Sequence, residues 1–478
     1  MIADREGEDI LAQAHLDEAE LMADAHIRAQ LYLEGVAEQD VYPGEAARAG
    51  LDAFDEPLPD VASGAADTLA HLDRFGSPAT AVSNGPNYFG FVIGGTLPAA
   101  AAAHRLASTW DQCASSATNS PVADRLERVA AGWLLDILDL PRESGVAFGT
   151  SATAGGLTAL SVARRQLLAR KGWDFDGDGL AGAPAVGVVV SDRVHITILK
   201  ALRLLGFGTS RIVKAPTDTL GRIDPARLPE LDDMTIVCLQ AGEVNIGAFD
   251  PFDTLVPKAK SAGAWVHVDG AFGLWARAAP RRRYLTEGIE GADSWTVDGH
   301  KWLNTPYDGG VCICRDKTAM AQTMNADAVY SLSAQDDQKN LGLEFSRGAR
   351  GIPIWAALRS LGREGVAQMV EGHCDMAAWL AQEAEKAGFE VLVAPVLNQV
   401  LLRLANDDDT TALQEMVQES GRAWFGTTRW QNAVALRISF SSWRTTWADV
   451  QRLLDVLVTA RSELTSQLAS GKQAFRCG

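Results

Sequence analysis

The sequence predicts an α/β protein with a large domain built on a mainly parallel sheet and a smaller α+β domain after it. Two patterns indicate this fold. Between about residues 146 and 315, short and continuously apolar runs alternate with helical segments, which is typical of parallel strands buried on both faces. After residue 351, a long helix leads into a second alternation of helices and short strands.

The residues before this region form an arm rather than a domain. Residues 8–40 carry apolar positions at helical spacing among many acids, and the Pro-rich stretch 56–59 then breaks the chain. Such an arm is too thin to fold alone, so we expect it to pack on another surface. We therefore divide the chain into an N-terminal helical arm (1–75), a large α/β domain (76–360) and a small C-terminal α+β domain (361–478).

The elements of the two domains follow in order. A long helical stretch, 122–140, ends at Pro141. The runs expected to form buried strands of the large domain are 186–190, 235–239, 264–268, 292–295 and 310–314. In the small domain we expect strands at 391–393, 400–404 and 435–439 and helices at 363–387, 409–420 and 446–470. Because doubly wound sheets bind ligands beyond the carboxyl ends of their strands, we look for the site there.

Composition limits the classes of function. The chain has 478 residues and a formal net charge of −18, which repels nucleic acid and anionic membranes. The acidic start argues against a signal peptide, and no apolar stretch is long enough to span a bilayer, so we expect a cytoplasmic protein. The six scattered cysteines indicate reduced thiols. No metal site is expected, since the acidic loop 174–179 lacks the later ligand of a calcium loop.

Four features stand at the ends of predicted strands. Residues 148–156 place small residues and hydroxyls before a helix, where backbone N–H groups can hold a phosphate. His195 follows a Val-rich strand and could stack on a flat ring. Asp269 ends an apolar strand, where a buried carboxylate needs a partner. Lys301 ends the next strand, and lysine readily forms a Schiff base.

Each feature alone has an ordinary explanation, such as a helix cap, a structural histidine or a solvated lysine. Together, and in this order, they match the needs of pyridoxal 5′-phosphate. The cofactor requires a phosphate cradle, a stacking ring, a carboxylate that keeps its ring nitrogen protonated, and a lysine. We therefore predict pyridoxal phosphate as the cofactor and Lys301, Asp269 and His195 as the catalytic residues.

The motifs around these residues resemble those of a known family. They are NGPNYFGFVIGG, TSATAGGLTAL, SDRVHITILKALRLLG, GAFDPFD, WVHVDGAFG, ADSWTVDGHKWL, GARGIPIWAALRSLG and ALRISFSSWRTT. From about Pro86 to its end, the chain resembles the group II pyridoxal-phosphate-dependent amino-acid decarboxylases. The resemblance implies the fold type I of pyridoxal-phosphate-dependent transferases, with a mainly parallel sheet of the seven-stranded type. It also implies a homodimer with active sites at the interface and the arm wrapped over the partner.

The same resemblance implies further cofactor and substrate contacts. The phosphate would be contacted by the backbone N–H of Ala152, the hydroxyl of Thr153 and the side chain of His300. His195 would stack above the ring, Ala271 would pack beneath it, and Asn245 would lie beside it. Phe91 and Val92 align with the stretch that shapes the substrate pocket.

The chain departs from the family pattern at the expected proton donor. Many members carry a loop tyrosine that protonates the carbanion after carbon dioxide leaves, but residues 331–345 contain none, and Tyr330 is the only nearby one. Loss of this donor could divert the carbanion toward oxygen and give an aldehyde. Arg347 would meet a substrate carboxylate or form a structural salt bridge. Arg437 lies where aminotransferases hold the α-carboxylate, although its motif favours a structural role.

These observations predict an L-amino-acid α-decarboxylase that releases carbon dioxide and an amine. The pocket segment 88–94 is apolar and uncharged, which favours a neutral aromatic or large apolar substrate. The alternatives keep the cofactor: oxidative deamination coupled to decarboxylation, a carbon–carbon lyase, an aminotransferase, or a pyridoxal-phosphate-binding protein without turnover. The sequence leaves open which amino acid is used and which group donates the proton.

Overall fold

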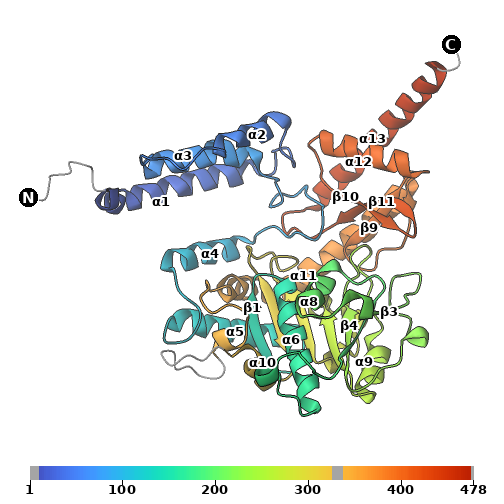
Figure 1. The fold of residues 1–478 in the computed structure, drawn as a ribbon. Helices are drawn as coiled ribbons and strands as arrows, with labels where there is room; N and C mark the ends of the chain where they lie inside the picture. Colours follow the sequence, from blue (N-terminus) through green and yellow to red (C-terminus); the bar gives the residue numbers. More distant parts are fainter. Residues whose placement is uncertain (1–9, 326–336, 475–478) are drawn as a thin grey trace, which may run out of the picture.

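The computed structural model describes residues 10–325 and 337–474. Figure 1 shows three parts: helices of an N-terminal arm, a large domain around a seven-stranded sheet, and a small domain around a four-stranded sheet. No helix in the two described ranges is both long and apolar enough to cross a membrane.

The large sheet is mainly parallel. Its strands are β1 (Gly145–Gly149), β2 (Gly187–Ser191), β3 (Val213–Ala215), β4 (Thr235–Gln240), β5 (Trp265–Asp269), β6 (Ser294–Asp298) and β7 (Gly310–Cys314). They lie in the order β1-β7-β6-β5-β4-β2-β3, and only β7 runs antiparallel to its neighbours. The predicted α/β fold class is confirmed. β1 was not predicted because it begins and ends with glycine, and β3 was not predicted because it has only three residues.

Helices cover both faces of this sheet. One face packs on α6 (Ala152–Arg170), α8 (Ile196–Leu204) and α10 (Lys317–Met324), and the other on α5 (Pro121–Ile137), α9 (Phe252–Ser261) and the start of α11 (Gly351–Lys386). Alternate strand residues divide between the two cores: Val188 and Val190 of β2 face the first, and Val189 faces the second. This two-sided burial explains the continuously apolar strands. The large domain also contains the α-helices α4 (Pro98–Trp110) and α7 (Phe175–Asp178), of which α7 is short.

A close approach between β7 and α6 shapes the carboxyl end of β6. A Cβ added to Gly310, the first residue of β7, would lie 2.4 Å from the Cα of Ser151, which caps α6. Only glycine fits there without moving the helix. Gly310 also pairs with Asp298, the last residue of β6. The first turn of α6 is therefore held beside Asp298.

The small domain has an antiparallel sheet. Its strands β8 (Glu390–Val391), β9 (Gln399–Arg403), β10 (Gly426–Trp430) and β11 (Ala433–Ser439) lie in the order β10-β11-β9-β8. The second half of α11, with α12 (Asp407–Glu419) and α13 (Trp447–Ala474), packs against this sheet. β10 was not predicted, because its Thr and Arg side chains alternate with no apolar run.

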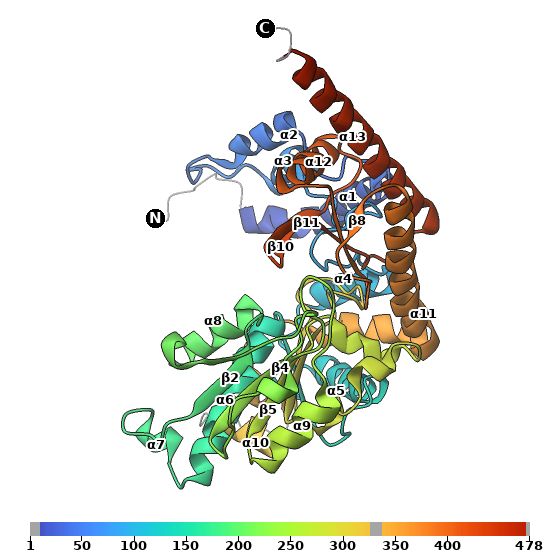
Figure 2. The same ribbon diagram turned by 90° about the vertical axis from the view of Figure 1, so that its right-hand side faces the viewer.

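The helix α11 connects the two domains, as Figure 2 shows. Its backbone leaves the helical conformation at Gly362, where φ is +62°. Before this break Ile354 packs in the core of the large domain, and after it Leu380 packs in the core of the small domain. The boundary predicted at residue 360 falls next to this break, and the three-part division of the chain remains a prediction.

The arm contains α1 (Ile10–Gly35), α2 (Glu45–Ala49) and α3 (Ala65–Gly76), which extend beside the small domain in Figure 1. Neither α2 nor α3, both of which are described in full, contains a buried residue. The exposed large hydrophobic side chains in the described part of the arm are Met22, Ile27, Leu31, Leu33, Tyr42, Leu51, Phe54, Leu58, Val61 and Leu72. The arm therefore has apolar surface available for further packing.

Candidate active site

A cavity of about 230 Å³ lies at the carboxyl ends of the central parallel strands. It is lined by Phe91, Val92, Ile93, His195, Gln240, Gly242, Val244, Asp269, Ala271, Phe272, Lys301, Tyr307 and Arg437. The structure thus brings together the three predicted catalytic residues, the predicted ring contact Ala271 and the predicted pocket residues Phe91 and Val92. They come from four separate stretches of the large domain, around residues 91–92, 195, 269–271 and 301.

Asp269 presents one free carboxylate oxygen to this cavity. It is the last residue of β5 and is only 8% exposed. Its Oδ1 accepts hydrogen bonds from the Ala271 N–H, at 3.2 Å, and from the Thr296 hydroxyl, at 3.4 Å. Within the described residues, Oδ2 has no hydrogen-bond partner. A protonated ring nitrogen is the kind of donor that this oxygen can bind.

His195 is held as a neutral ring. It caps the N-terminus of α8, where its Nδ1 accepts from the Thr197 N–H and lies 2.7 Å from the Thr197 hydroxyl. Burial lowers the pKa of His195; the nearby Asp269 carboxylate raises it, and the Lys301 ammonium lowers it further. An uncharged imidazole with a fixed orientation suits stacking on an aromatic ring.

The amine of Lys301 is linked to the start of α6 through Asp298. The Lys301 Nζ lies 3.2 Å from Asp298 Oδ2, and Asp298 Oδ1 accepts a 2.6 Å hydrogen bond from the Ala152 N–H. Asp298 is buried. His300 Nε2 also lies near it, at 3.7 Å, and the His300 Nδ1 accepts from the Gly309 N–H.

The start of α6 can hold a phosphate. Ser151 caps the helix by accepting from the Ala154 N–H, so the N–H groups of the first turn point outward from the helix end. Within the described residues the Thr153 hydroxyl makes no hydrogen bond. Backbone N–H groups, a free hydroxyl and the positive end of a helix dipole form a site for an anion. The residues present therefore fit pyridoxal phosphate: the start of α6 would hold its phosphate, and His195 and Ala271 would lie on the two faces of its ring.

The structure does not bring every predicted residue into the cavity. Asn245 donates through Nδ2 to Glu243 and accepts through Oδ1 from the Thr428 hydroxyl, while Val244 forms the cavity wall at this point. A contact of Asn245 with the ring oxygen therefore finds no support in this geometry. Tyr330 lies outside the described residues.

Arg347 lies in a buried ion pair away from the cavity. Its Nη1 and Nη2 donate to the two carboxylate oxygens of Glu127 at 2.8 and 2.7 Å, and Nη2 also donates to Gln338. The side chains of this pair are 3% and 0% exposed. Of the two roles considered for Arg347, the structure has the salt bridge.

The sequence favoured a structural role for Arg437, but the structure also places this residue at the cavity. It lies in β11, is 8% exposed and donates from Nε to the Val244 carbonyl at 2.7 Å. Its two terminal nitrogens have no partner among the described residues, and Arg437 lines the cavity. Burial lowers its pKa to about 10, so it stays charged at neutral pH. The segment 88–94 is uncharged, but the cavity also contains the charged Arg437, which an argument from that segment alone did not include.

Three further residues at the site carried signals that the sequence reasoning did not use. Gln240 ends β4 opposite Asp269, and its buried amide nitrogen has no partner in the described chain. A polar residue at the end of an apolar strand was the signal. Asp298 stands three residues before Lys301, and Tyr307, in the Pro/Gly-rich loop, stacks on His300 at 4.4 Å between ring centroids.

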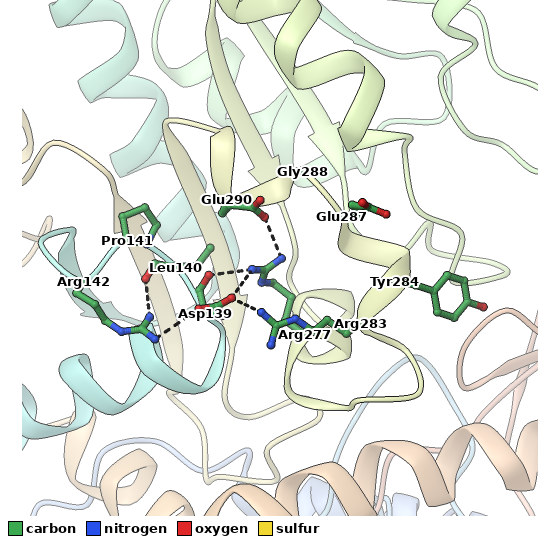
Figure 3. Close-up of a pocket in the computed structure, with 10 residues that line it drawn as sticks. All are labelled: Asp139, Leu140, Pro141, Arg142, Arg277, Arg283, Tyr284, Glu287, Gly288 and Glu290. Atoms are coloured by element: carbon green, nitrogen blue, oxygen red, sulfur yellow. Dashed lines mark hydrogen bonds and ion pairs between the residues drawn. The ribbon is translucent and has the colours of Figure 1, made fainter.

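A second cavity, of about 750 Å³, shows different chemistry (Figure 3). Apart from Glu287, its charged side chains bind one another: Arg277 contacts Asp139 and Glu290, and Arg283 also binds Asp139. The guanidinium of Arg277 also donates to backbone carbonyls. Since these charges are already satisfied, the cavity beside Lys301 is the candidate active site.

The fold and the site define a class of protein, the pyridoxal-phosphate-dependent enzymes of fold type I. A crystal structure of Oryza sativa TDC with PLP and tryptamine is similar over 94% of this chain and 98% of that one, with a TM-score of 0.86 and 24% identity. The family model described as "Pyridoxal-dependent decarboxylase conserved domain" matches residues 53–405. The chain therefore belongs to the family of pyridoxal-dependent decarboxylases, and its cofactor is pyridoxal 5′-phosphate.

Two similar proteins are named as decarboxylases of different amino acids. Tryptophan decarboxylase 1 from Oryza sativa subsp. japonica is 31% identical over 58% of this chain and 58% of that protein. L-2,4-diaminobutyrate decarboxylase from Rhizobium meliloti (strain 1021) is 27% identical over 98% of this chain and 94% of that protein. The match thus spans little more than half of the rice protein, and the two relatives differ in the amino acid that they are named for.

The buried ion pair leads to a prediction about stability. Replacing Arg347 by Leu leaves the Glu127 carboxylate, 0% exposed, without its cation. Loss of one partner of a buried pair costs about 3–5 kcal/mol in the free energy of unfolding. Chemical denaturation followed by tryptophan fluorescence measures this loss as a lower midpoint.

The double variant Glu127→Leu/Arg347→Leu is the matched control, and it should recover much of the loss because no charge is left unpaired. Arg347→Leu protein that remains folded should keep the wild-type KM. An unchanged denaturation midpoint combined with a raised KM would instead assign Arg347 to the substrate.

Proposed function

We propose that this protein removes the α-carboxylate of an L-amino acid as carbon dioxide, with pyridoxal phosphate held by Lys301. The observation that carries the proposal is the single cavity lined by the Lys301 amine, the Asp269 carboxylate and the neutral His195 ring. When bound, pyridoxal phosphate supplies a protonated ring that accepts the electron pair of the bond being broken.

The residues of the chain divide the work of binding and orientation. Lys301 is the amine that would take the aldehyde carbon, and the free Oδ2 of Asp269 would keep the ring nitrogen protonated. His195 would cover one face of the ring and Ala271 the other. The N–H groups and the Thr153 hydroxyl at the start of α6 would hold the phosphate. Together they fix the position of the ring.

Apolar walls favour loss of the carboxylate. Val92, Ile93 and Phe272 line the cavity and exclude water from part of it. An ionised carboxylate is poorly solvated beside such surfaces, whereas carbon dioxide is neutral and loses little there. A substrate carboxylate directed at these walls is therefore disposed to leave.

We predict that Asp269→Ala keeps the cofactor but lowers kcat by about 100-fold or more, because a neutral ring is a poor acceptor of electrons. Lys301→Ala is the comparison, and it should lose the covalent link to the cofactor that borohydride reduction fixes in the wild type. Carbon dioxide release and peptide mass mapping measure the two effects.

A near-wild-type kcat in Asp269→Ala would show that this carboxylate is structural. If the reduced cofactor were found on another lysine, the role proposed for Lys301 would be wrong. Acceptor-dependent formation of a keto acid without carbon dioxide would favour an aminotransferase.

We propose a neutral aromatic or large apolar amino acid as the substrate. Phe91, Val92, Ile93 and Phe272 offer apolar and aromatic surface, and the similarity to a tryptophan decarboxylase supports this choice. The guanidinium of Arg437 would draw the α-carboxylate of the substrate into the cavity before that carboxylate turns toward the apolar walls, and it would repel a cationic side chain. The similarity to a relative named for L-2,4-diaminobutyrate instead favours a substrate with a cationic side chain.

A specificity profile tests this proposal. We expect kcat/KM to be highest for tryptophan, tyrosine or phenylalanine, and at least about 100-fold lower for 2,4-diaminobutyrate, whose ammonium lacks a partner. Arg437→Gln should lower kcat/KM for the aromatic substrates by about 10- to 100-fold, mainly through KM.

If glutamate or diaminobutyrate were the best substrate, the aromatic proposal would have to be abandoned. Amine, aldehyde and hydrogen peroxide are measured in the same assays. If the amount of aldehyde formed equals the amount of carbon dioxide released, the product is the aldehyde and not the amine.

We also propose that the chain works as a homodimer. The arm exposes Ile27 and Leu31 of α1, 56% and 62% exposed, and Phe91 is 59% exposed although it lines the cavity. A second copy packed here would cover this apolar surface and close the site. Sedimentation equilibrium should give twice the chain mass, and a monomer at micromolar concentration would contradict the proposal.

A cytoplasmic location remains part of the proposal. The five described cysteines, Cys113, Cys238, Cys312, Cys314 and Cys374, are free thiols. Unpaired cysteines are usual in a reducing compartment. Fractionation of cells that produce the protein would test this location.

A further inference from the structure

The side-chain amide of Gln240 is buried at the cavity without a partner for its nitrogen. Gln240 is the last residue of β4, is 5% exposed and lines the cavity beside Lys301. Within the described residues, its Nε2 makes no hydrogen bond. Burial of an amide is unfavourable unless another group replaces the hydrogen bonds that it made to water. A ligand that binds in the cavity can supply the missing acceptor.

The sheet holds this amide next to Asp269. Gln240 pairs with Asp269 in the parallel register of β4 and β5, and the Asp250 carboxylate accepts the Gln240 backbone N–H at 2.8 Å. Cys238, two residues before Gln240, packs in the core that α6 and α8 cover. Trp265, four residues before Asp269, packs in the same core. Because side chains alternate along a strand, Gln240 and Asp269 lie side by side on the face of the sheet that α6 covers.

The strand order decides which edge of the cofactor ring would meet this amide. β5, which ends at Asp269, lies between β6 and β4. The start of α6 is on the β6 side, because the Ala152 N–H donates to Asp298 at the end of β6. In pyridoxal phosphate, the phosphate arm and the ring oxygen are on opposite sides of the axis through the ring nitrogen. With the nitrogen at Asp269 and the phosphate at α6, the oxygen would therefore face β4 and Gln240.

We propose that Gln240 is a positioning residue for the cofactor, whose amide N–H donates to the oxygen on the pyridine ring. This oxygen carries negative charge when the ring nitrogen is protonated, and hydrogen bonds to charged acceptors are the stronger ones. Gln240 and Asp269 then hold the two opposite charges of the ring from neighbouring strands. This inference rests on the proposed function, which places the cofactor at Lys301 and α6.

Other polar side chains near this edge are less suited to the role. Asn245, expected from the sequence to lie beside the ring, donates to Glu243 and accepts from Thr428. Arg437 also lines the cavity, but it comes from the small domain, and we assign it to the substrate carboxylate. Gln240, by contrast, belongs to the same sheet as the carboxylate that would hold the ring nitrogen. The experiment therefore compares Gln240 with Arg437.

The test measures the binding of two forms of the cofactor, without an assay of turnover. Pyridoxal phosphate and an analogue with hydrogen in place of the ring oxygen are titrated by calorimetry into the cofactor-free protein. Gln240→Met keeps the length of the side chain and removes the donor. We expect this variant to bind pyridoxal phosphate about 10- to 100-fold more weakly than the wild type, because a hydrogen bond to a charged oxygen is lost. The Kd of the analogue should change much less, since it has no oxygen to bind.

Gln399→Met is the matched control. Gln399, the first residue of β9, is a buried glutamine whose amide nitrogen also lacks a partner in the described chain, but it does not line the cavity. Both Kd values should stay as in the wild type. If Gln240→Met does not fold, as judged by circular dichroism, Gln240→Glu replaces it. The added carboxylate would repel the charged oxygen, so the same loss of preference for pyridoxal phosphate is expected.

An unchanged ratio of the two Kd values in the Gln240 variant, even with both forms bound more weakly, would overturn the inference. A ratio that changes equally in Gln399→Met, or that changes only in Arg437→Gln, would also overturn it. Borohydride reduction of the wild type separates these results from a failure of the proposed function. If the cofactor is fixed on Lys301 but the ratio is unchanged, only the role of Gln240 is wrong.

Discussion

The buried carboxylate of Asp298 is the contact on which the geometry of the site depends. It joins the end of β6, the first N–H of α6 and the amine of Lys301. The position of Lys301 is thereby fixed relative to the helix end that would hold a phosphate. Gly310 permits this arrangement, since a side chain at that position would collide with the cap of α6.

Burial sets the charges around the cavity. It lowers the pKa of His195, which keeps the ring uncharged, and it lowers the pKa of Arg437 only to about 10, which leaves a cation. Asp269 keeps one carboxylate oxygen without a partner in the described chain. Fixed groups of both signs, held at the edge of an apolar cavity, are the arrangement that stabilises charge as it moves during a reaction.

The cavity also belongs to both domains. Asp269 ends β5 and Lys301 follows β6 of the large sheet, whereas Arg437 comes from β11 of the small sheet. The two domains are joined by α11, which breaks at Gly362; its core residues up to Cys374 pack in the large core, and those from Met376 on pack in the small core. The distance between Lys301, which would hold the cofactor, and Arg437, which would meet the substrate, therefore depends on how the two domains pack. Selectivity can thus change through residues that touch neither ligand.

The sequence by itself determined the α/β class, the positions of most strands along the chain and the grouping of His195, Asp269 and Lys301, because apolar runs and residues at strand ends are local signals. Only the tertiary structure decided which polar side chains reach the cavity. Arg347 pairs with Glu127, 220 positions away, and Asn245 binds Thr428 of the small domain. Arg437 enters the site because the pairing of β11 fixes the face on which its side chain lies. Such partners are distant in sequence and meet only when the chain has folded, so no local pattern contains them.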